Sequence, residues 1–187
     1  MIAAGYLTNQ LLIAMPGLGD ADFSGTVMLM CEHTAKGAMG LILNRPLQMR
    51  MREIFRQLEI EVTDERAAEL PVLRGGPVQS DRGFVVHRAG GQWDSTISVS
   101  DAIQVTTSRD ILRSIARGTG PTDAFLALGY AGWEGGQLEG EIRANAWITA
   151  PVDEHVVFDV PFGERWNASA GLLGIELSRI SPTSGNA

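Results

Sequence analysis

The sequence predicts an α+β fold, in which a mixed or antiparallel sheet, curled toward a barrel, is flanked by three to four helices. Short apolar, β-rich runs cluster early in the chain, and helical patterns interrupt them irregularly. A doubly wound parallel sheet would need strands and helices in regular alternation, which this order lacks. With 187 residues, of which 44% are hydrophobic, the chain is long enough for one domain spanning 1–187. We expect its core at about 8–180 and a loose tail at 181–187, which has little to bury.

The first strands are expected to form a hairpin near the N-terminus. Leu11–Met15 is a short apolar run that ends before Pro16. Thr26–Cys31 is apolar at consecutive positions, which indicates a central strand covered on both faces. Ala38–Leu43 follows a short link in which Gly37 supplies the turn, so these two runs predict a hairpin. Pro46 should end the second strand, because proline cannot donate to a ladder.

Helices are predicted where apolar residues recur with helical spacing. The first runs from Met51 to Leu58 and places Arg52 and Arg56 on its outer face. Another begins after Ser108, a suitable N-cap, and stops at Gly118. The later helical patterns are Gln137–Asn145 and Phe162–Leu173. The remaining strand-like runs are Val72–Leu73, Phe84–His87, Thr96–Val99, Ala124–Tyr130 and Trp147–Thr149.

The net charge of −7 argues against a stand-alone DNA-binding protein, because nucleic-acid affinity comes largely from Lys and Arg on phosphates. The strongest basic cluster contains Arg45, Arg50, Arg52 and Arg56, interrupted by Glu53. A solvated helix face explains this cluster, and direct DNA contact through 45–56 is the alternative.

The number and spacing of cysteines and histidines limit which cofactors the chain could bind and in which cellular compartment it is expected. Cys31 is the single cysteine, so an intrachain disulfide and a Cys-rich metal site are excluded. No two histidines have the spacing of a helical metal pair, and we expect neither a metal nor another cofactor. The N-terminus lacks the basic region of a signal peptide, and no apolar run approaches the ~20 residues of a membrane helix. A reducing cytoplasmic location without membrane contact is expected.

Cys31, Glu32 and His33 place three reactive side chains in one expected strand. Strand alternation would point Cys31 and His33 to the same face and Glu32 to the other. This arrangement allows a hydrolase or transferase that uses a Cys–His pair. We favour the simpler interpretation, in which Cys31 is buried in the core and Glu32 and His33 lie at the strand end, because free cysteine is among the most buried residue types.

Two turns offer a candidate binding rim. Pro77 pushes Gly76 toward an extended conformation, and Gly75 permits a positive φ or a close backbone approach. Arg45 or Arg74 could bind a carboxylate or phosphate through two hydrogen bonds. The candidate ligand-binding residues are Glu32, His33, Asn44, Arg45, Gly75 and Gly76. Their ligand would be a small anion, a peptide or a protein loop, unless Asn44 and Arg45 instead bind loop carbonyls and hold the turns together.

Several blocks in one order give the chain a family resemblance that covers roughly Leu11 to Leu177. The main blocks are Leu12–Leu18, Cys31-Glu32-His33, Gly37–Pro46, Gly75–Val78, Arg82–Val85, Thr107–Asp110, Gly129–Trp133 and Asn145-Ala146-Trp147. With these blocks the chain resembles the AlgH/YqgE family of bacterial proteins. Arg74 departs from that pattern, since members often carry an apolar residue there.

The resemblance implies a small, single-domain, cytoplasmic α+β protein without an established activity. Some members carry a transcriptional-regulator label, but the sequence contains no DNA-binding motif that would support direct operator contact. The leading hypothesis is therefore a non-enzymatic binding or regulatory protein. A Cys31/His33 enzyme and a DNA-binding regulator that uses 45–56 are the alternatives.

Overall fold

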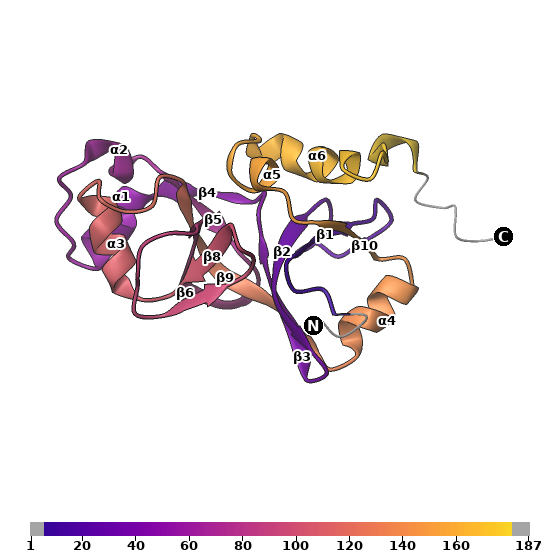
Figure 1. The fold of residues 1–187 in the computed structure, drawn as a ribbon. Coiled ribbons are helices and arrows are strands. Elements are labelled where there is room, and N and C mark those ends of the chain that lie inside the picture. Colours follow the sequence, from indigo (N-terminus) through magenta and orange to yellow (C-terminus); the bar gives the residue numbers. More distant parts are fainter. Residues whose placement is uncertain (1–5, 181–187) are drawn as a thin grey trace.

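The computed structural model describes residues 6–180 and has the predicted α+β architecture (Figure 1). The expected tail 181–187 lies outside the described residues. The strands are β1 Gln10–Ala14, β2 Val27–Thr34, β3 Gly37–Ile42, β4 Pro46–Arg50, β5 Pro71–Arg74, β6 Val78–Arg88, β7 Thr96–Ser98, β8 Ile103–Thr106, β9 Ala124–Glu134 and β10 Trp147–Pro151. The helices are α1 Met51–Gln57, α2 Glu65–Ala68, α3 Arg109–Ala116, α4 Gln137–Arg143, α5 Glu154–Phe158 and α6 Arg165–Gly171, with short 3-10 turns at Phe162–Glu164 and Leu177–Arg179.

The strands form one curled, mixed sheet with the order β10-β1-β2-β3-β9-β6-β8-β7. Neighbours along this path are antiparallel, whereas β5 joins β9 in parallel and carries β4 on its other side. The prediction of three to four helices is too low, because residues 6–180 contain six α-helices. α2 and α5 were not expected, since four or five residues are too few to show a helical repeat.

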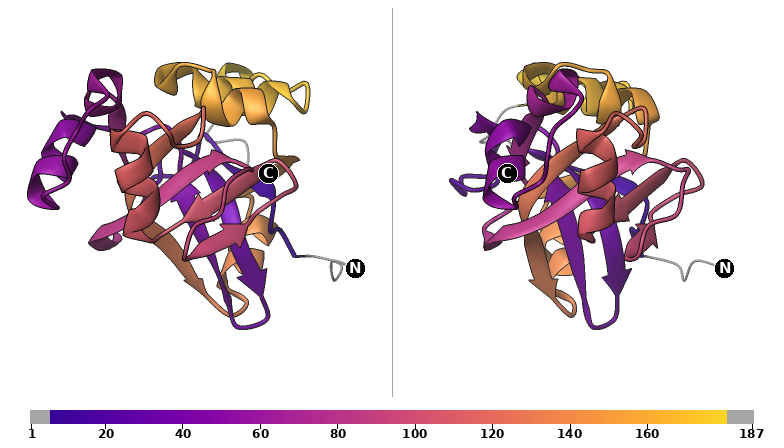
Figure 2. Two further views of the ribbon diagram at one scale, coloured as in Figure 1. Left: turned by 60° about the vertical axis from the view of Figure 1, so that its left-hand side comes forward. Right: turned by 90° about the vertical axis from the view of Figure 1, so that its left-hand side faces the viewer.

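The long strand β9 joins the two halves of the molecule. Its first half pairs with β5 and β6, and its last four residues pair with β3. Figure 1 shows α1, α2 and α3 beside β6 and β8 on one side, and α4 beside the β2–β3 hairpin on the other. Figure 2 shows the C-terminal helices α5 and α6, in orange to yellow, lying together along one side of the sheet.

The apolar run in β2 is buried from Val27 to Cys31, as predicted, because both faces of this strand pack in the core. Leu29 and Cys31 pack into the central core beneath α5 and α6, whereas Met28 and Met30 pack on the opposite face with α4. A third cluster lies beneath α1, α2 and α3. Helices thus cover both faces of the sheet, and the central core combines residues from the N-terminal and C-terminal parts of the chain.

Pro46 occupies a different place from the one predicted. β3 already ends at Ile42, and Pro46 is the first residue of β4. β4 pairs with β5 alone, so its proline sits at the start of an edge strand, where the missing N–H is tolerated.

Candidate functional site

The six predicted binding residues do not form one rim. Asn44 and Gly75 lie together, because the N–H of Ile42 donates to the Gly75 carbonyl over 2.8 Å and Asn44 binds Val27 at the start of β2. His33 is six residues farther along β2. At about 3.3 Å per residue, the two ends of this strand segment are about 20 Å apart. Glu32 and His33 are therefore remote from the other four residues.

Asn44 and Arg45 hold the loop that precedes β2. The Asn44 side chain accepts the Val27 N–H over 3.1 Å and donates to the Gly25 carbonyl over 2.9 Å. Arg45 donates to the carbonyl of Ser24. These contacts match the structural role considered as the alternative for both residues. Ligand binding at the predicted rim stays a prediction.

Gly75 and Gly76 permit the close backbone approach that the sequence suggested. The Gly75 N–H donates to the Leu128 carbonyl over 2.7 Å. A Cβ on Gly76 would lie 2.0 Å from the carbonyl carbon of Tyr130. Both glycines are buried against β9, and their lack of a side chain lets the two backbones pack closely where the segment after β5 crosses β9.

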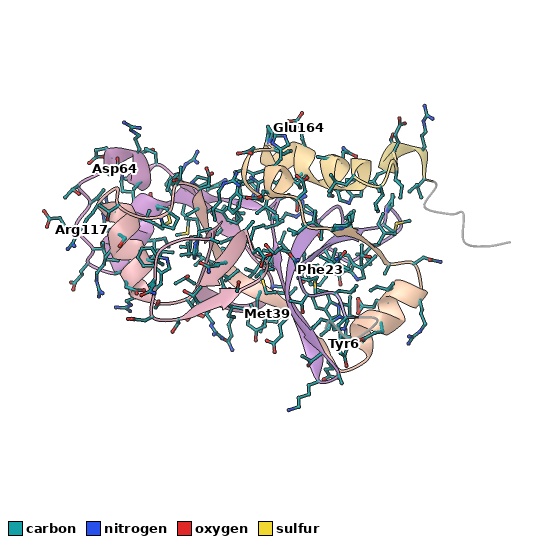
Figure 3. The ribbon with its side chains drawn as sticks, viewed as in Figure 1. Tyr6, Phe23, Met39, Asp64, Arg117 and Glu164 are labelled. Atoms are coloured by element: carbon teal, nitrogen blue, oxygen red, sulfur yellow. The ribbon has the colours of Figure 1, made fainter. Side chains whose placement is uncertain are left out.

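His33 ties the N-terminal segment and α4 to the end of β2. Its Nδ1 accepts the Leu7 N–H over 3.0 Å, which leaves the proton on Nε2 to donate to Glu139 over 2.5 Å. The Tyr6 ring and the imidazole pack in a T-shaped arrangement, with centroids 5.1 Å apart. The pKa of Glu139 is lowered, chiefly by its own backbone N–H and further by His33. Figure 3 shows Tyr6 in this half of the molecule, far from Asp64 at the other end.

Cys31 is buried, as the favoured interpretation has it. The Cys–His pair that the enzyme alternative requires is not formed, because a β-bulge interrupts β2 between Met30 and Glu32. Beyond the bulge His33 pairs with Ala38 and faces α4, whereas Cys31 remains in the opposite, central core. The prediction that both side chains share a face is therefore wrong. Burial raises the pKa of Cys31 to about 12, so the thiol lacks the ionised form that a nucleophile needs.

The basic stretch is partly neutralised by acidic side chains. Arg52 donates to Glu65 over 3.0 Å and to Glu69 over 2.8 Å. Arg50 and Arg56 are exposed, and the apolar side of α1 is buried as predicted. The ion pairs of Arg52 reduce the positive potential that DNA phosphates would meet.

Residues 6–180 contain neither a cluster of metal ligands nor a membrane-spanning helix. No group of three or more His, Cys, Asp or Glu side chains in this range could hold a metal ion. No helix in the same range is long and apolar enough to cross a membrane.

A cleft of about 210 Å³ lies between α1 and α3, with β6, β8 and β9 as its floor. We call it the α1–α3 cleft. Its apolar lining comes from Ile54, Leu58, Val85, Leu112, Leu126 and Leu128. Its polar lining comes from Gln57, Asp81, Thr106, Thr107, Ser108 and Arg109, and Gly83 completes the floor. No chemical motif in the sequence predicted this cleft, although the blocks Arg82–Val85 and Thr107–Asp110 contribute residues to it.

One wall of the cleft is stabilised by a buried polar pair. His87 is fully buried, and its Nε2 lies 2.7 Å from the hydroxyl of Thr106. Its Nδ1 lies 2.8 Å from the Arg88 carbonyl, so Nδ1 carries the proton and Nε2 accepts from Thr106. Burial lowers the pKa of His87. Thr106 is also fully buried, which keeps this pair out of reach of a ligand.

Comparison with known proteins identifies relatives along the whole chain. The family model described as AlgH-like matches residues 11–178. A UPF0301 protein from Thioalkalivibrio sulfidiphilus is 51% identical over 187 residues, which is 100% of both chains. Another from Nitrosococcus oceani is 47% identical over 182 residues, 97% of each chain.

Solved structures also resemble this chain. The solution structure of the AlgH protein from Pseudomonas aeruginosa has a TM-score of 0.81 and 42% identity, and the match covers 100% of this chain and 99% of that one. A crystal structure from Corynebacterium diphtheriae shares the fold, with a TM-score of 0.69 at 19% identity over 87% of this chain and 84% of that one. The predicted resemblance and fold class are thus confirmed, and this chain belongs to the AlgH-like family.

Proposed function

We propose that this protein is a non-enzymatic binding protein whose partner site is the α1–α3 cleft. The observation that carries the proposal is the composition of the cleft, in which six apolar side chains are joined by polar side chains, four of them exposed: Gln57, Asp81, Thr107 and Arg109. Binding sites typically combine an apolar lining with a few polar groups that fix orientation. A regulatory effect would then pass through the bound partner, without direct contact to an operator.

The charges at the rim favour a ligand without a large net charge. Asp81 and Arg109 are both exposed and lie on the same cleft, so their opposite charges offset each other. Gln57 and Ser108 add neutral hydrogen-bonding groups. A protein segment fits these conditions better than a nucleic acid or a free polyphosphate.

An enzymatic function finds less support in the same region. Thr106 and His87 have a suitable contact for a nucleophile and base, but both are fully buried. Cys31 is separated from His33 by the bulge and carries a raised pKa. We therefore favour binding over the Cys31/His33 hydrolase or transferase.

The test is an NMR screen of small peptides and fragments on the labelled protein, with two variants of α1. Gln57→Trp places a large side chain at the cleft, whereas Arg56→Trp adds the same side chain to a neighbouring exposed position that does not line it. We expect shifts of the Gly83, Leu112 and Leu128 amides, lost in Gln57→Trp and retained in Arg56→Trp. Shifts confined to another surface, or equal binding by both variants, would contradict the proposal.

A further inference from the structure

We infer that the α1–α3 cleft binds an extended segment of a partner protein, which adds to the free edge of β6 at Gly83 and inserts one apolar side chain between α1 and α3. This inference rests on the proposed function and names the form of its ligand. It follows from the sheet register, the direction of the Gly83 backbone and the size of the cleft.

The edge of β6 is free on the side of the cleft because β8 is shorter than β6. β8 pairs with β6 only from Val85 to Arg88. Beyond Thr106 the chain turns away, since the Thr107 N–H donates to the Ser95 carbonyl over 2.9 Å and Ser108 is the N-cap of α3. Within residues 6–180 no strand therefore continues β8 alongside Gly83.

The backbone of Gly83 faces this free edge. Gly83 is paired with Leu128 of β9, but the Leu128 carbonyl accepts the Gly75 N–H on the other side of β9. In an antiparallel pair, a residue directs its N–H and C=O to the same side, and bonded and non-bonded pairs alternate. The Gly83–Leu128 pair is thus a non-bonded pair, and the N–H and C=O of Gly83 point away from β9. Gly83 itself lines the cleft, so both groups are available to a ligand there.

A glycine at this position lets another main chain approach. Gly83 is partly exposed, and a Cβ added to it would meet the side chain of Leu126 at 3.1 Å. The absence of a side chain therefore leaves the cleft floor uncovered beside the free edge of β6. Main-chain pairing with an exposed sheet edge is a common mode of peptide recognition.

The free groups select a peptide main chain over an anion. A peptide unit supplies both the acceptor for the Gly83 N–H and a donor for the Gly83 carbonyl. A carboxylate or phosphate would accept from the N–H but leave the carbonyl desolvated without a donor, which is unfavourable. The opposite charges of Asp81 and Arg109 also give no net attraction for an anion.

The cleft volume sets the size of the inserted group. About 210 Å³ is smaller than the roughly 300–1,000 Å³ of sites that enclose drug-sized ligands. One apolar side chain can contact Leu112 and Leu126 while its main chain stays at the edge of β6. Side-chain insertion gives specificity, and backbone pairing gives register.

The test uses a display library of random linear octapeptides, selected on the full chain, and affinities of the selected peptides in solution. Gly83→Pro removes the N–H, whereas Gly83→Ala keeps it and adds a Cβ at the same place. We expect Gly83→Pro to weaken binding about tenfold more than Gly83→Ala, as one lost hydrogen bond would. N-methylation of the peptide residue that pairs with Gly83 should have a similar effect. Circular dichroism and NMR spectra of both variants establish that they are folded.

The outcomes separate this inference from the proposed function. Equal binding by Gly83→Pro and Gly83→Ala, together with loss in Gln57→Trp, would overturn strand addition but keep the cleft as the site. Failure of every peptide to bind the wild-type chain would overturn the inference, and failure of the fragment screen as well would overturn the proposed function. Protection of the Gly83 amide from hydrogen exchange on peptide binding would support strand addition directly.

Discussion

The imidazole of His33 in β2 donates its Nε2 proton to Glu139 of α4 over 2.5 Å, and this partly buried contact fixes the far end of the hairpin. The other ring nitrogen accepts the Leu7 N–H, and Thr8 accepts the His33 backbone N–H over 3.0 Å. One side chain therefore connects three segments that are distant in sequence.

Replacing His33 by leucine should lower the free energy of unfolding by about 2 kcal/mol, because the Leu7 N–H loses its acceptor and Glu139 loses its donor. Urea unfolding measures this loss, and hydrogen exchange at Leu7 should become faster. Glu139→Gln keeps an oxygen acceptor for His33 and should cost less than about 1 kcal/mol. A larger cost for Glu139→Gln than for His33→Leu would contradict this role of His33.

Cys31 should react with thiol reagents only when the protein unfolds. Its pKa rises from 9.0 to about 12 on burial, which lowers the thiolate fraction about a thousandfold at pH 8. The rate of reaction with a disulfide reagent at pH 8, compared with the rate in urea, measures this effect. Rapid labelling of the native protein would instead favour the enzyme alternative that uses Cys31.

Sequence patterns predicted the elements whose signals are local. The hairpin of β2 and β3 and the apolar face of α1 follow from runs and spacings within a few residues. β4, β8 and the first half of β6 were missed, because these segments are short or exposed and depend on pairing with distant strands. The bulge beside Cys31 left no trace in the sequence, and it moved His33 to the other face.

The α1–α3 cleft could not be predicted for the same physical reason. Ile54, Gly83, Leu112 and Leu128 come from four separate elements, and no local motif links them. Among the residues that the structure describes, the N–H and C=O of Gly83 have no partner strand because β8 stops pairing with β6 at Val85. This pairing between distant segments cannot be read from the sequence around Gly83. Gly75 and Gly76 were identified because a Gly-Gly-Pro sequence restricts the backbone locally, although their partners on β9 were not.

His87 should make the protein less stable as the pH falls below about 6.5. Burial lowers its pKa in the folded state, so the unfolded chain binds more protons below the ordinary histidine value. The stability contributed by neutral His87 is thus complete above pH 6.5 and is lost progressively as the pH falls toward the lowered pKa. The free energy of unfolding in urea, measured from pH 7.5 to pH 5, should show this slope.

The control for His87 is His155, whose side chain is 73% exposed. His87→Gln should reduce the slope between pH 6.5 and pH 5 by more than His155→Gln does, because the His87 side chain is buried and the His155 side chain is exposed. An equal reduction in both variants, or none in His87→Gln, would show that other groups cause the acid sensitivity. The acidic groups with a lowered pKa, including Asp110 and Glu139, should further reduce the free energy of unfolding at lower pH, where they become protonated.

Gly76→Ala should lower the free energy of unfolding by about 3 kcal/mol, because its Cβ would lie 2.0 Å from the Tyr130 carbonyl carbon and 2.2 Å from its oxygen. The obstacle is backbone within β9, which cannot move without disturbing its pairing with β3 and β6. In a chain of this size the loss should lower the Tm by about 6–12 °C. Gly19→Ala is the matched control, because no atom lies within 4 Å of its added Cβ, and its effect should stay within about 0.5 kcal/mol. Equal stability of the two variants would mean that β5 and β9 can separate at little cost, contrary to the tight crossing that brings Gly75 against Gly129 and Gly76 against Tyr130.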